Sequence, residues 1–260
     1  MINICKLCRK SKALRNSHAI PDSIFTVIYK KNSGKAIRLT NTDTKIEFSS
    51  DSLDTKQLCD DCEKKINLQY ESYSINLLRN VFNNVKKEED GVHFSVVDVD
   101  KFIKFILAIY WRAATSTHES YKGAVMHRDL LSKNGDEKLR LCLFNDTKIP
   151  SLLFSVKIRR LKDSTGTWSL SDLKNLIVTP FHHPYGEDKK VQVDFVFEGF
   201  YFSVISPALS DKERRSDMIL YPKGRQFVAK YIDFNSVPEL NEIINATVIK
   251  VSNGHSSITS

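Results

Sequence analysis

The chain is poor in glycine, and this scarcity limits the kinds of site that it can build. It has 9 glycines among 260 residues, and none of them belongs to a glycine-rich loop of the type that binds nucleotide phosphates. Nucleotide hydrolysis is therefore not expected. The sequence also lacks internal repeats and low-complexity tracts. With 41% hydrophobic and 27% charged residues, its composition is that of a soluble globular protein.

Long apolar stretches are absent as well. The longest one, residues 102–114, is interrupted by Lys104 and Arg112, and it is shorter than the roughly 20 residues that a membrane-spanning helix needs. The first residues do not combine a basic region with an apolar core, so the sequence predicts no signal peptide. We therefore expect no membrane partner and a cytoplasmic location.

Acidic residues are outnumbered by basic ones. The chain has 39 lysines and arginines against 31 aspartates and glutamates, a formal net charge of +8. Such a surplus favours polyanionic partners, because each phosphate that is neutralised releases counterions. The charge supports a nucleic-acid hypothesis, although a mildly basic chain is also soluble without any such partner.

Only five cysteines occur, and four of them form two C-x-x-C pairs. Cys5 and Cys8 make the first pair, Cys59 and Cys62 make the second, and Cys142 stands alone. Four thiolates in two such pairs suit a tetrahedral zinc ion, so the sequence predicts a structural zinc site. Two disulfides are disfavoured because no secretory signal is visible. A thioredoxin-like redox motif would need a single pair at the start of a helix.

The pattern of the chain predicts two parts: a zinc-binding module over residues 1–84, and a second domain over residues 92–252 with a loose tail at 253–260. In the first part, residues 25–29 are rich in the β-branched and aromatic side chains that strands favour. Short strands are expected around Ile37 and Ile46, and an apolar helical period follows Cys59. The charged run at residues 86–91 indicates a linker.

The second part is predicted to begin with a buried helix and to continue as a β-rich domain. Asp98 or Asp100 is expected to cap a helix that ends at Thr115, and a further helix is expected over residues 122–133, stopped by Asn134 and Gly135. Beyond residue 150 we expect strands at residues 152–160, 191–197, 200–205, 225–232 and 244–251, with a tight hairpin between the second and third. The fold class is therefore α+β.

A third motif lies between the cysteine pairs, Ser17-His18-Ala19-Ile20-Pro21. Together with the first C-x-x-C and the segment Leu58-Cys59-x-x-Cys62-Glu63, it resembles the layout of zinc-stabilised HNH endonucleases. The resemblance covers about the first seventy residues and is closest to a divergent bacterial branch with an "SHIIP"-type strand. It implies a treble-clef, ββα-metal-like module in which two knuckles grip zinc.

The resemblance also implies a set of functional residues. His18 matches the general base that takes a proton from the attacking water, while one Mg²⁺ or Mn²⁺ neutralises the leaving oxygen. The family's metal-binding aspartate is Ser17 here, and its asparagine or histidine after the last cysteine is Glu63. Either the site has decayed, or Glu63 supplies the carboxylate for the metal, with Asn16 or Asp54 assisting.

Two functions follow as hypotheses from different classes. The first is a divergent HNH-type nuclease, or nuclease-like protein, that acts on DNA or RNA in a bacterial anti-phage setting. The alternative is a catalytically inactive, zinc-stabilised subunit that binds nucleic acid or protein within a larger complex. The first requires His18 and a carboxylate within about 5 Å of each other, whereas the second requires only the four sulfurs.

Overall fold

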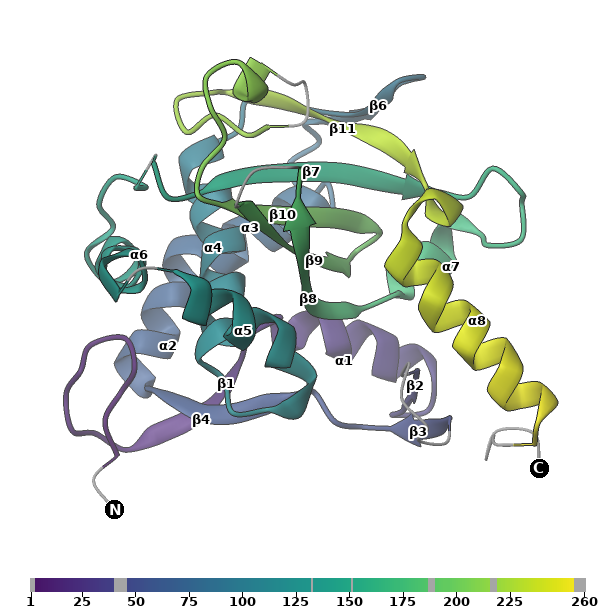
Figure 1. Ribbon diagram of the computed structural model, residues 1–260, viewed down its shortest axis with the longest axis horizontal. Coiled ribbons are helices and arrows are strands. Elements are labelled where there is room, and N and C mark those ends of the chain that lie inside the picture. Colours follow the sequence, from purple (N-terminus) through teal and green to yellow (C-terminus); the bar gives the residue numbers. More distant parts are fainter. Residues whose placement is uncertain are drawn as a thin grey trace.

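The structure is a computed structural model, and it describes residues 3–39, 46–131, 133–150, 152–186, 190–215 and 219–254. It is a mixed α/β fold with a seven-stranded sheet, helices packed against the sheet, and a two-stranded hairpin near the N-terminus (Figure 1). No helix in these ranges is both long enough and apolar enough to cross a bilayer.

The N-terminal hairpin pairs two strands that lie far apart in the sequence. Strand β1 (Leu14–His18) runs antiparallel to β4 (Asp54–Cys59), with His18 opposite Asp54. Between them the chain forms helix α1 (Asp22–Lys31) and the small pair β2 (Ala36–Arg38) and β3 (Glu47–Ser49). The strands expected around Ile37 and Ile46 are thus confirmed.

Residues 25–29, in contrast, are helical, so the strand-like reading of this segment was wrong. They belong to α1, which has an acidic residue, Asp22, in its first turn and two lysines in its last. Ile24, Phe25 and Ile28 recur at the spacing of one helix face, and all three are buried. Burial of that face outweighs the strand preference of single β-branched residues.

The helical period after Cys59 is confirmed. Helix α2 (Asp60–Ile66) continues through one π-helical turn (Asn67–Glu71) into α3 (Ser72–Leu78). The prediction of a linker at residues 86–91 was wrong. Strands β5 (Val85–Lys87) and β6 (Gly91–Ser95) form an antiparallel pair here, at the edge of the large sheet. A Cβ atom on Gly91 would lie 2.6 Å from the carbonyl oxygen of Ala229, so this glycine serves a close strand approach.

The large sheet has the order β5-β6-β11-β7-β10-β9-β8. Its remaining strands are β7 (Ser155–Lys162), β8 (Val178–Tyr185), β9 (Lys190–Phe197), β10 (Phe200–Ser206) and β11 (Gln226–Asp233). All neighbouring strands are antiparallel except β11 and β7. The predicted hairpin is confirmed, with Glu198 at φ 52° and Gly199 at φ 71°, as its two-residue turn requires.

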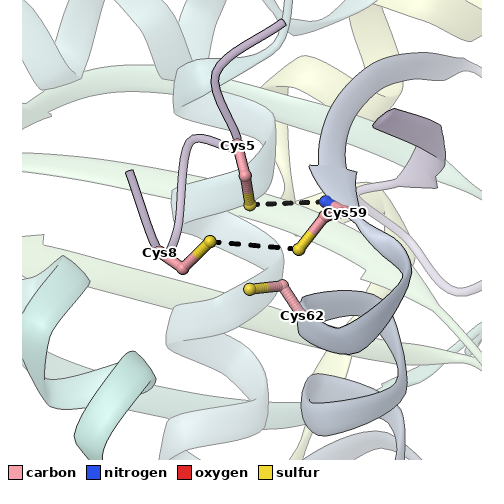
Figure 2. A group of neighbouring side chains, drawn as sticks. All are labelled: Cys5, Cys8, Cys59 and Cys62. Carbon is pink, nitrogen blue, oxygen red and sulfur yellow. Dashed lines mark hydrogen bonds between the residues drawn. The ribbon is translucent and has the colours of Figure 1, made fainter. Parts of the chain in front are cut away.

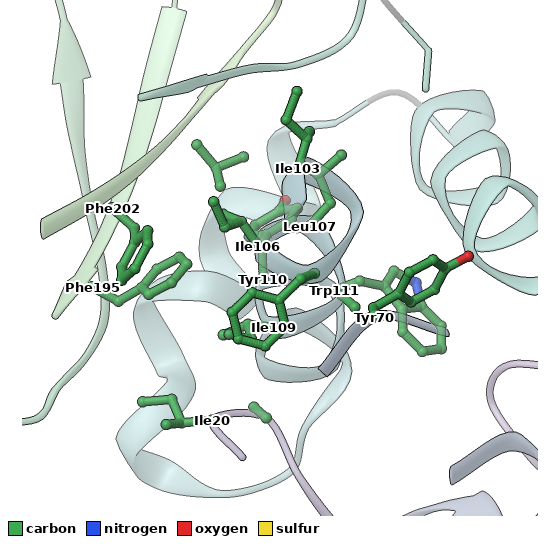
Figure 3. Close-up of a cluster of buried hydrophobic side chains, with 14 of the residues drawn as sticks. Ile20, Tyr70, Ile103, Ile106, Leu107, Ile109, Tyr110, Trp111, Phe195 and Phe202 are labelled. Atoms are coloured by element: carbon green, nitrogen blue, oxygen red, sulfur yellow. The ribbon is translucent and has the colours of Figure 1, made fainter. Parts of the chain in front are cut away.

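Helix α4 (Val99–Thr115) lies at the centre of the molecule and is buried nearly all round, as expected. Asp98 caps it by accepting a hydrogen bond from the backbone N–H of Lys101 at 3.0 Å. Figure 3 shows its side chains between the sheet residues Phe195 and Phe202 and the aromatic ring of Tyr70. The same apolar cluster contains side chains from the first 84 residues, while a boundary at residues 84–92 stays a prediction.

Three further helices, α5 to α7, follow α4 before the last one, and α6 differs from expectation. Helix α5 (Lys122–Leu130) is followed by α6 (Lys133–Asn145), so Asn134 and Gly135 begin a helix instead of stopping one. Leu139 and Leu143 of α6 are fully buried, and their packing explains the continuation. The short helix α7 (Leu170–Asn175) lies beside β7.

The strand predicted at residues 244–251 is wrong. This segment belongs to helix α8 (Pro238–Ser252), which begins with proline at its first position. Leu240, Ile243 and Ile244 pack on a second apolar cluster that includes Phe234 and Val237. Helical spacing brings these residues to one face, which a strand of the same sequence could not do. The predicted tail at 253–260 lies mostly outside the described residues.

Candidate metal centre and the histidine beside it

The two cysteine pairs converge. The sulfur atoms of Cys5, Cys8, Cys59 and Cys62 all lie within 4.8 Å of one another, and the sulfurs of Cys8 and Cys59 are 3.9 Å apart (Figure 2). A tetrahedral zinc ion with Zn–S bonds of about 2.3 Å would separate its sulfur ligands by about 3.8 Å. All five cysteines are free thiols, so neither pair is a disulfide. The four sulfurs could hold a metal ion such as zinc.

Local backbone geometry presents the sulfurs to one another. The first pair sits on a tight turn in which the N–H of Arg9 bonds to the carbonyl of Cys5, with Arg9 itself at φ 61°. In the second pair, Cys59 ends β4 and Cys62 lies in the first turn of α2. A helix N-terminus favours negative charge, which suits a thiolate at this place.

The electrostatics of the cluster favour a cation. A hydrogen bond from Cys62 and nearby backbone N–H groups lower the pKa of Cys5 to about 4, although burial opposes this. The contact with Cys5 and burial raise the pKa of Cys62 in turn. Negative charge on one sulfur therefore hinders ionisation of its neighbour. A divalent ion at the centre would let all four sulfurs ionise together.

His18 lies at the end of β1, and a fifth of its side chain, 21%, is exposed. Its Nε2 atom is 2.9 Å from the hydroxyl oxygen of Ser52 and 3.7 Å from the carboxylate of Asp22. Asp22 is exposed and opens helix α1. The sequence analysis missed both partners. The chain bends at Pro21, so the separation of His18 and Asp22 carried no helical signal.

Glu63 occupies a different environment. It lies in the first turn of α2, and its carboxylate interacts with the hydroxyl of Ser17, which is fully buried and accepts the backbone N–H of Leu58 at 3.1 Å. Burial raises the pKa of Glu63, while the charge of Arg112, the Ser17 hydrogen bond and, less strongly, the charge of His18 oppose the rise. One of its carboxylate oxygens is buried without a hydrogen-bond partner in the described part of the chain.

The predicted catalytic residues are therefore only partly brought together. In the described part of the chain, no hydrogen bond or ion pair joins His18 to Glu63. Ser17, which contacts Glu63, and His18 are adjacent in β1, so their side chains point to opposite faces of the strand. Asp54 stands opposite His18 in the register, and Asn16 is exposed two positions earlier. In the part of the chain that the structure describes, no side-chain hydrogen bond joins Asn16 or Asp54 to the imidazole of His18.

Basic residues gather on the exposed side of this hairpin. The residues concerned are Lys10, Lys12, Arg15 and Lys56, all exposed. Lys12 pairs with Asp61 at 2.6 Å and Arg15 with Asp60 at 3.5 Å. Exposed pairs of this kind are weak and leave the lysines and arginines able to meet another anion.

Two adjacent histidines, His182 and His183, lie within strand β8. The imidazole of His183 lies 3.4 Å from the buried carboxylate of Asp194 and 3.3 Å from the carboxylate of Glu239.

Comparison with known proteins does not identify a family. No protein-family model, no curated protein and no solved structure matches the chain.

Proposed function

We propose that this chain is a zinc-stabilised, HNH-like nuclease that hydrolyses phosphodiester bonds in DNA or RNA, with His18 as its general base. One observation carries the proposal. An accessible imidazole and an exposed carboxylate, His18 and Asp22, lie 3.7 Å apart at one end of the β1·β4 strand pair, whose other end carries Cys59 of the cysteine cluster. A nuclease of this type needs such a pair, together with room for an ion and a phosphate.

The order of elements supports a treble-clef module. A cysteine turn, the β1·β4 hairpin and a helix that carries the last cysteine follow one another, with α1, β2 and β3 inserted into the hairpin. This is the order that the HNH resemblance implies. The zinc ion would be held by Cys5, Cys8, Cys59 and Cys62 and would stabilise the hairpin without entering the reaction.

Asp22 supports the reaction better than Glu63 does. Mg²⁺ and Mn²⁺ prefer oxygen ligands and keep several waters, so a carboxylate that serves them must be reachable from solvent. The side chain of Asp22 is 60% exposed, whereas the Glu63 carboxylate is hydrogen-bonded to the hydroxyl of the buried Ser17. When bound, the divalent ion would neutralise the charge on the leaving oxygen.

His18 would do the remaining chemistry with help from its neighbours. Its Nε2 atom would take the proton of the attacking water, which would replace the Ser52 hydroxyl that now lies 2.9 Å from this atom. The exposed basic side chains of Arg15 and Lys56 would hold the phosphate backbone of the substrate. Asp54, across from His18, would assist in positioning.

Cleavage assays test the proposal. Plasmid DNA, single-stranded DNA and single-stranded RNA are incubated with the zinc-loaded protein in Mg²⁺ and in Mn²⁺. We expect His18→Ala to lower the rate by about 10²-fold or more, the usual value of a general base. Asp22→Asn should lower the rate and raise the metal concentration that is needed, while Glu63→Gln should cleave as the parent does. Cleavage that His18→Ala leaves intact would refute the role of this residue.

A second candidate is a zinc-stabilised binding subunit without catalysis. An apolar hollow of about 490 Å³, lined by Tyr73, Phe82, Asn84 and Val96, favours it. Phe82 and Val96 are exposed at 46% and 82%, which suits a protein partner. No cleavage of any of the three substrates by the zinc-loaded protein would favour this candidate. A bacterial anti-phage setting and a cytoplasmic location stay predictions.

A further inference from the structure

A small cavity lies beside the first cysteine pair. Its volume is about 140 Å³, and it is lined by Lys6, Arg9, Trp111, Thr115, Arg128 and Asp136. These residues come from the cysteine turn, the C-terminal end of α4, and helices α5 and α6. Three lysine or arginine side chains therefore surround one space that has a single carboxylate in its wall.

The charges of the wall do not cancel. The Arg128 guanidinium donates a hydrogen bond to Asp136 at 2.9 Å, so the charge of this carboxylate is balanced by Arg128. The Lys6 ammonium donates to the backbone carbonyl of Thr115, which uses one of its three N–H groups. The Arg9 guanidinium lies 3.9 Å from Glu137 in an exposed, weak pair. Three cationic side chains and one carboxylate line the cavity, so its lining carries a net positive charge.

Trp111 also lines the cavity. Trp111 is 1% exposed, and its indole N–H is buried without a hydrogen-bond partner anywhere in the described residues. Tryptophan is a donor only, and a buried N–H without an acceptor is costly to keep. This N–H is out of reach of a water-sized molecule, so Trp111 serves as a reporter of the cavity and not as a ligand.

We propose that this cavity binds a phosphate group. A phosphate offers several acceptor oxygens, which match the guanidinium of Arg9 and the ammonium of Lys6. Guanidinium groups bind phosphate oxygens through strong, charge-assisted hydrogen bonds. The site is separate from His18 and does not depend on cleavage. Its phosphate belongs either to a free phosphate monoester or to a polynucleotide backbone.

The indole N–H gives a direct test, because the chain has only two tryptophans. In ¹⁵N-labelled, zinc-loaded protein, Trp168→Phe identifies the indole signal of Trp111. Inorganic phosphate is then added at constant ionic strength, with chloride as the control salt. We expect the Trp111 signal to move and to saturate while that of the exposed Trp168 stays in place.

Two matched variants distinguish phosphate binding in the cavity from nonspecific attraction of phosphate to a basic protein. Arg9→Gln and Lys10→Gln each remove one positive charge from neighbouring exposed residues, and only Arg9 lines the cavity. Loss of a charge-assisted hydrogen bond should weaken phosphate binding about tenfold in Arg9→Gln. Lys10→Gln should change it less than about twofold, as an exposed charge outside the cavity does. Equal weakening in both variants would refute the site.

Competition then identifies the source of the phosphate. A nucleoside monophosphate and an oligonucleotide without terminal phosphates are each added to the phosphate-bound protein. If only the monophosphate displaces phosphate, the site takes a free monoester, and if the oligonucleotide also does so, the site takes a backbone phosphate. If the Trp111 signal does not move at about 10 mM phosphate, where even a millimolar site would be mostly filled, the proposal is wrong.

Discussion

Loss of one buried carboxylate should reveal how strongly the N-terminal helices are tied to the centre of the fold. Arg112 on α4 and Glu71 in the π-helical turn form an ion pair and hydrogen bond, with side chains 1% and 8% exposed. The substitution Glu71→Gln keeps an oxygen that can accept from the guanidinium but removes the negative charge. The positive charge of Arg112 would then be buried without its main countercharge.

The expected cost follows from that burial. Breaking a buried ion pair by removing one partner typically costs about 3–5 kcal/mol, because the remaining charge is uncompensated. Glu63 also attracts Arg112, so a value near the lower end, about 3 kcal/mol, is expected here. With a urea dependence of about 2 kcal/mol per molar, the unfolding midpoint should fall by about 1.5 M.

The assay is urea unfolding of zinc-loaded protein, followed by both circular dichroism and tryptophan fluorescence. Asp60→Asn is the matched control, because Asp60 pairs with Lys64 on the same helix at 2.6 Å but in an exposed position. It should leave the midpoint almost unchanged. The double variant Glu71→Gln/Arg112→Met should be more stable than Glu71→Gln alone. A midpoint for Glu71→Gln that matches the control would refute the reasoning.

Three further predictions concern metal and pH. Chelation of zinc, or Cys62→Ser, should lower the melting temperature of the whole protein, because Cys5, Cys59 and Cys62 belong to the main apolar cluster; zinc added back should restore it only in the parent. Burial raises the pKa of Glu63, so Glu63→Gln should be more stable than the parent at pH 7, and the gain should vanish below the unfolded pKa of 4.5, where both states are protonated. Burial lowers the pKa of His127 to about 4, so between pH 6.5 and pH 4 the unfolded chain binds a proton that the folded protein does not. The free energy of unfolding should therefore fall by up to about 3 kcal/mol over this range. In urea titrations, His127→Gln should flatten this decline.

Local patterns predicted part of this fold well. The cap at Asp98, the buried helix that follows it and the hairpin at Glu198 and Gly199 all rest on interactions within a few residues. The segments at 25–29 and 244–251 were misread, because their β-branched residues favour strands locally. Distant apolar clusters decide their conformation, and a single sequence does not display those clusters.

The candidate site also has one part that the sequence predicts and one part that depends on packing. The sequence by itself determined the four-sulfur cluster, because two C-x-x-C pairs carry their ligand geometry in their spacing and zinc chemistry accepts few alternatives. Only the tertiary structure decided which carboxylate faces His18. The bend after β1 brings Asp22 to the imidazole, whereas the strand pleat turns Ser17, and Glu63 with it, to the buried side. Side-chain direction depends on how separate segments pack together, and the sequence does not display that packing.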